Sequence, residues 1–83
     1  MADIYGDPKA HIKNDILLEF KRLKAQSGQT LPEKWLTSVY FPTLTTAEKN
    51  AFNDAVHELI ADGLVEDLRG TLKLTKKGAD LLN

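Results

Sequence analysis

Apolar residues between Thr45 and Gly63 recur three and four positions apart, the spacing that places side chains on one face of an α-helix. These residues are Phe52, Ala55, Val56, Leu59 and Ile60. Thr45 and Glu48 have the spacing of a capping box, and Gly63 stands where a left-handed residue commonly ends a helix. The pattern therefore predicts a helix over residues 45–62.

Two short runs with strand character follow, residues 64–68 and 71–75, and they flank the turn dipeptide Arg69-Gly70. This arrangement predicts a β-hairpin. A two-residue loop would place Val65 opposite Leu74 and Glu66 opposite Lys73. A longer loop would shift this register, and the pairing of Asp67 with Leu72 is a reason to consider one.

After the hairpin, Thr75 can cap a last short helix. Its apolar residues are Ala79, Leu81 and Leu82. Gly78 weakens this helix because glycine loses more backbone freedom than other residues when a helix forms.

The N-terminal half predicts two further helices. Residues 1–6 are expected to form a loose arm, after which Asp7 and Pro8 have the pattern of a cap and a first helical residue. We expect this first helix to run to about Ala25, with an inward face formed by Ile12, Ile16, Leu17, Phe20 and Leu23. Leu18 lies off that face, so it is either an exposed residue or part of a self-association surface.

Thr30 and Glu33, again in capping-box spacing, open a second helix. Its candidate buried residues are Leu31, Trp35, Leu36 and Val39. Pro42 restrains the residue before it from helical geometry, so the helix should end at Tyr40 or Phe41 and residues 41–44 should form a turn.

Length and composition indicate one small domain over residues 1–83. The chain is 42% hydrophobic and 28% charged, which is typical of a globular domain with a single core. It has no cysteine, so disulfides are excluded. No apolar run approaches the roughly 20 residues that span a bilayer, and no secretory signal is apparent. We therefore expect a mainly α-helical fold with a small antiparallel hairpin, a cytoplasmic location and no membrane partner.

Residues 59–66, Leu-Ile-Ala-Asp-Gly-Leu-Val-Glu, and residues 74–78, Leu-Thr-Lys-Lys-Gly, carry a family resemblance. They are similar to the segments that join the recognition helix to the wing, and that close the wing, in winged helix-turn-helix domains. The resemblance covers about residues 8–82, although the helix before Gly63 is about a turn longer than usual. The elements predicted above follow the order helix, helix, turn, helix, strand, strand, short helix, which is similar to that of these domains.

The resemblance further implies a small DNA-binding regulator of transcription, in which helix 45–62 enters the major groove and the wing, residues 64–75, contacts phosphate. Asn50 and Asn53 have the donor and acceptor groups that read adenine. The candidate contacts to double-stranded DNA are Thr46, Lys49, Asn50, Asn53, His57, Arg69, Lys73, Lys76 and Lys77. The ordinary alternative is a solvated helix face beside a hairpin whose lysines protect an edge strand.

The uneven distribution of charge along the chain leads to a second hypothesis, in which the domain binds a protein. Residues 45–68 carry one basic and six acidic side chains, whereas residues 69–83 carry four basic and one acidic. The domain would then be a protein-interaction module that uses Asp54 and Glu58, or Leu18 with the N-terminal arm, to bind a partner or a second copy. DNA binding requires the wing lysines and the helix polar groups to share one face. An unbroken acidic patch from Asp54 to Asp67 would instead favour a basic protein partner.

Catalysis and cofactor binding have no support in the sequence. The chain lacks a glycine-rich phosphate loop and a recognisable nucleophile with its base and orienting acid. His11 and His57 are far apart with no other ligands around them, so we expect no metal site. A domain of this size also has little room for a closed small-molecule pocket. The sequence thus predicts a non-enzymatic protein.

Overall fold

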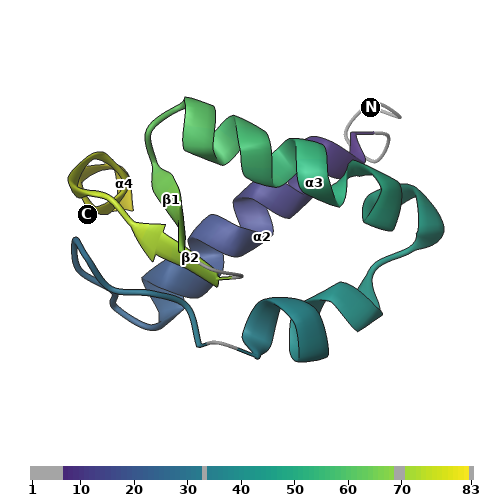
Figure 1. Cartoon of the computed structure of the whole chain (residues 1–83), viewed down its shortest axis with the longest axis horizontal. Coiled ribbons are helices and arrows are strands. Elements are labelled where there is room, and N and C mark those ends of the chain that lie inside the picture. Colours follow the sequence, from purple (N-terminus) through teal and green to yellow (C-terminus); the bar gives the residue numbers. More distant parts are fainter. Residues whose placement is uncertain (1–6, 33, 69–70, 83) are drawn as a thin grey trace.

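The computed structural model describes residues 7–32, 34–68 and 71–82, and Figure 1 shows the path of the chain. The expected arm 1–6, Glu33 of the second capping box and the hairpin turn 69–70 lie outside the described residues. The elements are α2 (Pro8–Arg22), the π-helix η1 (Trp35–Tyr40), the 3-10 turn η2 (Phe41–Thr43), α3 (Thr46–Ala61), β1 (Val65–Leu68), β2 (Thr71–Leu74) and α4 (Lys76–Leu82). The expected mainly helical fold with one antiparallel hairpin is confirmed for these residues.

Helix α2 begins as the sequence predicts but ends earlier. The Asp7 side chain accepts a hydrogen bond from the Ala10 amide at 3.2 Å, and Pro8 is the first helical residue. The predicted end at Ala25 is wrong because Lys24 adopts a left-handed conformation, with φ 54°. The chain thus leaves the helix after Arg22, and Leu23, which was expected to face inward, is exposed.

The second helical segment differs most from expectation. It is a π-helix of six residues, and the Phe41 amide donates to the Leu36 carbonyl five residues earlier. Residues five apart consequently lie over one another, and the rings of Trp35 and Tyr40 stack with centroids 4.9 Å apart. The wider turn buries Tyr40. The predicted burial of Val39 is wrong, because this turn leaves Val39 56% exposed.

Helix α3 has the predicted cap and a Gly63 terminus. Thr45 Oγ1 accepts from the Glu48 amide at 3.2 Å, and Glu48 Oε1 accepts from the Thr45 amide at 2.9 Å, so the capping box is formed. Gly63 has φ 77°. Helices α2 and α3 pack side by side (Figure 1).

The hairpin has the register predicted for a two-residue loop, with Val65 opposite Leu74 and Glu66 opposite Lys73. Asp67 is paired with Leu72 within the same register. The sequence did not predict the isolated antiparallel bridge between Thr30 and Lys73. This bridge places a third chain segment beside β2, so β2 has a neighbour on each side.

The core lies between the two long helices and the inner face of the hairpin. Its fully enclosed side chains come from α2, the Leu31 segment, α3 and the two strands: Ile12, Ile16, Phe20, Leu31, Leu59, Val65 and Leu74. Phe52, Val56 and Ile60 of α3, which were expected on the same inward face, are only partly buried. One flank of α3 therefore keeps an apolar surface that none of the other described elements fully covers.

Candidate functional site

The outward side of α3 carries a row of polar side chains with no hydrogen bond or ion pair to any described residue. We define the polar ridge as Thr46, Asn50, Asn53 and His57, all of which are exposed. Helical geometry places these four positions within about a quarter of the helix circumference. The ridge consists of hydroxyl, amide and imidazole groups, which can hydrogen-bond to nucleic-acid bases or to phosphate.

Glu58 is directed to the α2 side of the helix, away from the ridge. Its carboxylate forms ion pairs with Lys9 and with Lys13, whose Nζ lies at 3.0 Å. Hydrogen bonds from these two lysines lower the pKa of the Glu58 carboxyl. Lys13 also approaches Asp62 at 3.6 Å. The contacts with α2 therefore neutralise much of the acidity that the sequence assigns to this helix.

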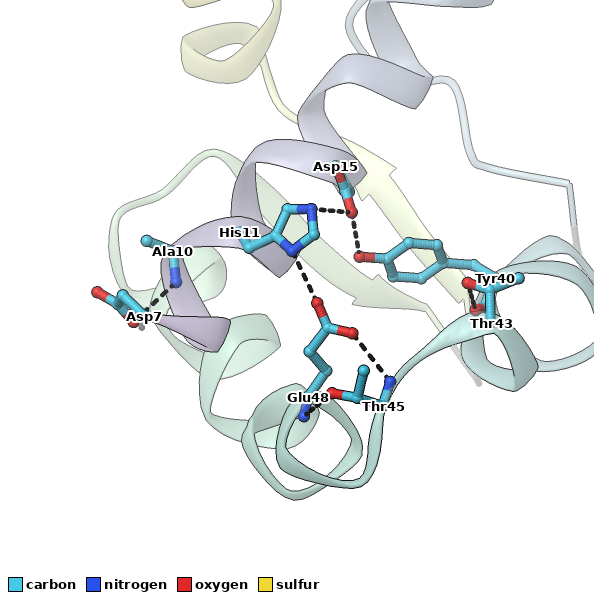
Figure 2. A network of polar contacts seen from close by, with 8 residues as sticks. All are labelled: Asp7, Ala10, His11, Asp15, Tyr40, Thr43, Thr45 and Glu48. Carbon is cyan, nitrogen blue, oxygen red and sulfur yellow. Dashed lines mark hydrogen bonds and ion pairs between the residues drawn. The ribbon is translucent and has the colours of Figure 1, made fainter. Parts of the chain in front are cut away.

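A second polar network fixes the start of α3 (Figure 2). Glu48 Oε2 lies 2.7 Å from His11 Nδ1, and His11 Nε2 lies 3.3 Å from Asp15 Oδ2. The Tyr40 hydroxyl donates to Asp15 at 2.8 Å, and burial, followed by this bond, raises the Tyr40 pKa. The pKa of Glu48 is lowered, mainly because its carboxylate accepts a hydrogen bond from the Thr45 backbone amide. The network thus joins α2, η1 and the α3 cap.

Sequence reasoning missed this network because its members come from three separate segments. Apart from the predicted capping box of Thr45 and Glu48, only the four-residue spacing of His11 and Asp15 could have signalled one of its contacts. The network connects the first turn of α3 to α2 and η1 and so holds that helix in position. We assign it no ligand.

The candidate basic residues are distributed unevenly. Lys73 pairs with Glu66 at 3.1 Å, and Lys76 lies 3.8 Å from Asp80. Lys49 is exposed at the flank of the polar ridge, with Nζ 5.5 Å from the centre of the Phe41 ring. Lys77 is also exposed, and Arg69 lies outside the described residues. Lys49 is therefore the cation nearest in sequence to the ridge residues.

The hairpin directs Lys73 away from α3. Val65 and Leu74 are buried on the inner face, and side chains alternate along a strand, so Glu66 and Lys73 project on the opposite face. Asp67 is on the same face as its buried partner Leu72. Lys73 therefore does not share a surface with the polar ridge, and the hairpin places a carboxylate beside α3 instead.

The acidic stretch from Asp54 to Asp67 is not an unbroken patch. Glu58 and Asp62 face lysines of α2, and Glu66 faces Lys73. Within the described residues, Asp54 and Asp67 are the two acids of this stretch that lack an ion-pair partner. Leu18, the other partner-binding candidate, is 50% exposed on the outer side of α2.

A groove of about 240 Å³ lies where η1, α3 and the hairpin meet. Its apolar lining comes from all three elements: Leu36, Phe52, Val56, Ile60 and Leu72. Its polar lining residues are Thr37, Asn53, His57, Asp67 and Thr71. The groove is thus continuous with the polar ridge through Asn53 and His57, which belong to both. The sequence did not reveal it because it forms only where these three segments pack together.

In the part of the chain that the structure describes, no helix is long and apolar enough to cross a membrane. The same residues contain no group of three side chains able to hold a metal ion. Comparison of the chain with protein-family models, curated proteins and solved structures finds no match. Function is therefore inferred from the polar ridge and the groove themselves.

Proposed function

We propose that this chain is a winged helix-turn-helix protein, a small cytoplasmic regulator of transcription that binds double-stranded DNA through the polar ridge of α3. The element order supports the winged-helix part of the proposal, since two helical segments, a long helix and a hairpin follow one another. The bridge between Thr30 and Lys73 adds support, because it attaches the segment between the first two helices to the hairpin.

The observation that carries the DNA-binding proposal is the contrast between two sides of α3. Thr46, Asn50, Asn53 and His57 are exposed and have no partner among the described residues. Glu58 on the same helix is paired with Lys9 and Lys13, so most of its repulsion toward phosphate is offset within the protein. A helix that enters the major groove reads bases with polar groups in its N-terminal half, where Thr46, Asn50 and Asn53 lie.

The same contrast weakens the alternative in which the acidic helix face binds a basic partner. That alternative uses Asp54 and Glu58 together, and Glu58 already has two cationic partners within the chain. A single exposed aspartate provides little electrostatic attraction in water. Lys73 of the wing projects from the face opposite to α3, so the expected shared face of wing lysines and helix polar groups is not formed by this residue. We prefer DNA as the partner of the polar ridge on the uncharged polar groups of α3, with Lys49 in place of Lys73 as the phosphate contact beside it.

The test is an amide-by-amide NMR titration of the protein with a random-sequence DNA duplex at low and at raised salt. We expect amides from Thr46 to His57 to shift together at low salt and to recover at raised salt, since phosphate contacts release counterions. Asn50→Ala should reduce discrimination between duplex sequences, whereas Asn14→Ala on the exposed side of α2 should not. Shifts confined to residues outside α3, or no shifts at low salt, would contradict the proposal.

A further inference from the structure

The groove between η1, α3 and the hairpin has a size that restricts its occupant. Ligand pockets for drug-sized molecules measure about 300–1,000 Å³, and this groove measures about 240 Å³. It can therefore enclose one large apolar side chain more readily than a cofactor or a nucleotide. Binding surfaces between proteins often use one such side chain as an anchor in a pocket.

The apolar residues of the groove retain surface for that anchor. Phe52, Val56 and Ile60 occur at helical spacing on α3, yet each is only partly buried. Leu36 of η1 and Leu72 of β2 line the groove beside this row without burying it fully. Transfer of an apolar side chain from water to this surface would be favourable at about 25 cal/mol per Å² of apolar area buried.

The charge of the groove adds a modest preference for the residue beside the anchor. Asp67 is the one carboxylate among the ten lining residues, and it has no ion pair with a described residue. No lysine or arginine lines the groove, so a phosphate or carboxylate ligand would meet an unfavourable charge. The Asp67 carboxylate, which has no ion-pair partner among the described residues, is complementary to a basic side chain.

The polar rim fits a polypeptide backbone. Thr37 and Asn53 line the groove, and neither side chain has a hydrogen-bond partner among the described residues. Their hydroxyl and amide groups can donate to carbonyl oxygens and accept from amides. The Thr71 hydroxyl is already engaged, since it donates to the Leu31 carbonyl at 3.1 Å.

We propose that this groove is a docking site for a protein partner, which inserts an apolar side chain over Val56 and Ile60 and places a neighbouring lysine or arginine against Asp67. This second binding surface goes beyond DNA binding. Asn53 and His57 line the groove and also belong to the polar ridge, so a docked partner would cover part of the DNA-binding face. The partner and DNA would then compete.

The test is an NMR titration with two capped hexapeptides, Gly-Gly-Leu-Lys-Gly-Gly and Gly-Gly-Leu-Glu-Gly-Gly, at millimolar concentration. We expect the lysine peptide to shift the amides of Asn53, Val56, His57 and Asp67, and the glutamate peptide to bind more weakly. Asp67→Asn should reduce the affinity for the lysine peptide about two- to fivefold, the range for an exposed ion pair. Asp54→Asn removes an acid that lies outside the groove and has no ion pair with a described residue, so it should leave this affinity unchanged.

A second variant tests the apolar contact. Val56→Thr keeps the shape of the side chain while adding a hydroxyl to the groove, so it should weaken binding of both peptides by about threefold or more. Equal binding of the two peptides, or no shift at the groove with the lysine peptide, would overturn the proposal. Concentration-dependent shifts of the same amides in the protein alone would also overturn it, by assigning the groove to a second copy of the chain.

The two proposals fail separately. Asp67→Asn removes a negative charge beside the polar ridge, so it should bind DNA at least as well as the unaltered protein while binding the lysine peptide more weakly. Loss of both activities in this variant would contradict the separate role assigned to Asp67. Folding of each variant is checked by the amide spectrum of the free protein.

Discussion

Gly78 lies so close to Leu64 that a Cβ atom added to the glycine would stand 2.3 Å from the Leu64 carbonyl oxygen. Thr75 strengthens this contact, because its hydroxyl donates to the Gly63 carbonyl at 2.5 Å and accepts from the Gly78 amide at 3.0 Å. The two segments that resemble winged-helix domains, around Gly63 and around Gly78, therefore touch each other. Gly78 is required by the close approach of α4 to the junction between α3 and β1.

The first prediction concerns this approach. Gly78→Ala should lower the free energy of unfolding by about 1–3 kcal/mol, although alanine is the better helix former by about 1 kcal/mol. The added methyl group would meet a backbone oxygen, which cannot rotate away like a flexible side chain. Denaturant unfolding measures the effect. Leu81→Ala in the same helix is the control, because Leu81 is 61% exposed and its loss should matter little. An alanine variant as stable as the unaltered protein would show that α4 moves freely away from Leu64.

The ends of α2 and α3 provide a matched pair for a second prediction. Ala25 donates to Phe20 and Lys24 to Lys21 at the end of α2, and Leu64 donates to Leu59 and Gly63 to Ile60 at the end of α3. Both sets of bonds form a Schellman motif. The left-handed position is Lys24 in one helix and Gly63 in the other, with φ of 54° and 77°. The same backbone geometry is thus formed once with glycine and once without it.

Lys24→Gly should therefore stabilise the protein by about 0.5–1 kcal/mol, because glycine adopts positive φ without the steric cost of a Cβ atom. Gly63→Ala should destabilise it by a similar amount, and steric crowding adds little, since the nearest atom to the new Cβ would be Lys77 Cδ at 3.6 Å. Thermal unfolding of both variants measures the pair. Changes of the same sign would contradict the assignment of left-handed strain to Lys24.

The third prediction concerns acid stability. The pKa values of Glu48 and Glu58 are lowered in the folded protein from the ordinary value of 4.5. A carboxyl group whose pKa is lowered by folding stabilises the folded state at pH values above its ordinary pKa. This stabilisation is lost as the pH falls through the pKa of the folded state. The free energy of unfolding should thus decrease on acidification below about pH 5. In the Glu48→Gln variant, the free energy of unfolding should decrease less steeply as the pH falls. Denaturant unfolding at several pH values measures this dependence, and a pH dependence equal to that of the unaltered protein would contradict the role of the capping carboxylate. Asp54→Asn, which removes an acid with no ion pair among the described residues, is the control.

The fourth prediction concerns the phosphate contact. Lys49→Ala should weaken binding to all duplex sequences and reduce the slope of log affinity against log salt by about one. Lys21→Ala removes the same charge from the last turn of α2, away from the polar ridge, and should leave the slope unchanged. Fluorescence anisotropy with a labelled duplex at several salt concentrations measures both. Equal effects of the two substitutions would indicate general charge attraction rather than a contact beside α3.

The local elements of this protein could be predicted from sequence where short-range chemistry decides them. The capping box of Thr45 and Glu48 and the cap at Asp7 form as expected, and so does the hairpin register, because each depends on groups a few residues apart. The prediction was wrong where another segment or an unusual backbone decides the outcome. Sequence alone did not reveal the left-handed Lys24, and the π-helix replaced the expected burial of Val39 with that of Tyr40.

The candidate site shows the same division. Helical periodicity in the sequence is enough to place Thr46, Asn50, Asn53 and His57 on one side of α3, because it fixes their relative direction. The pairing of Glu58 with lysines of α2 and the position of Asp67 in a groove with α3 depend on how the elements pack. Side chains distant in the sequence meet only when their elements pack, so the charge of the polar ridge and the groove beside it are properties of the folded chain.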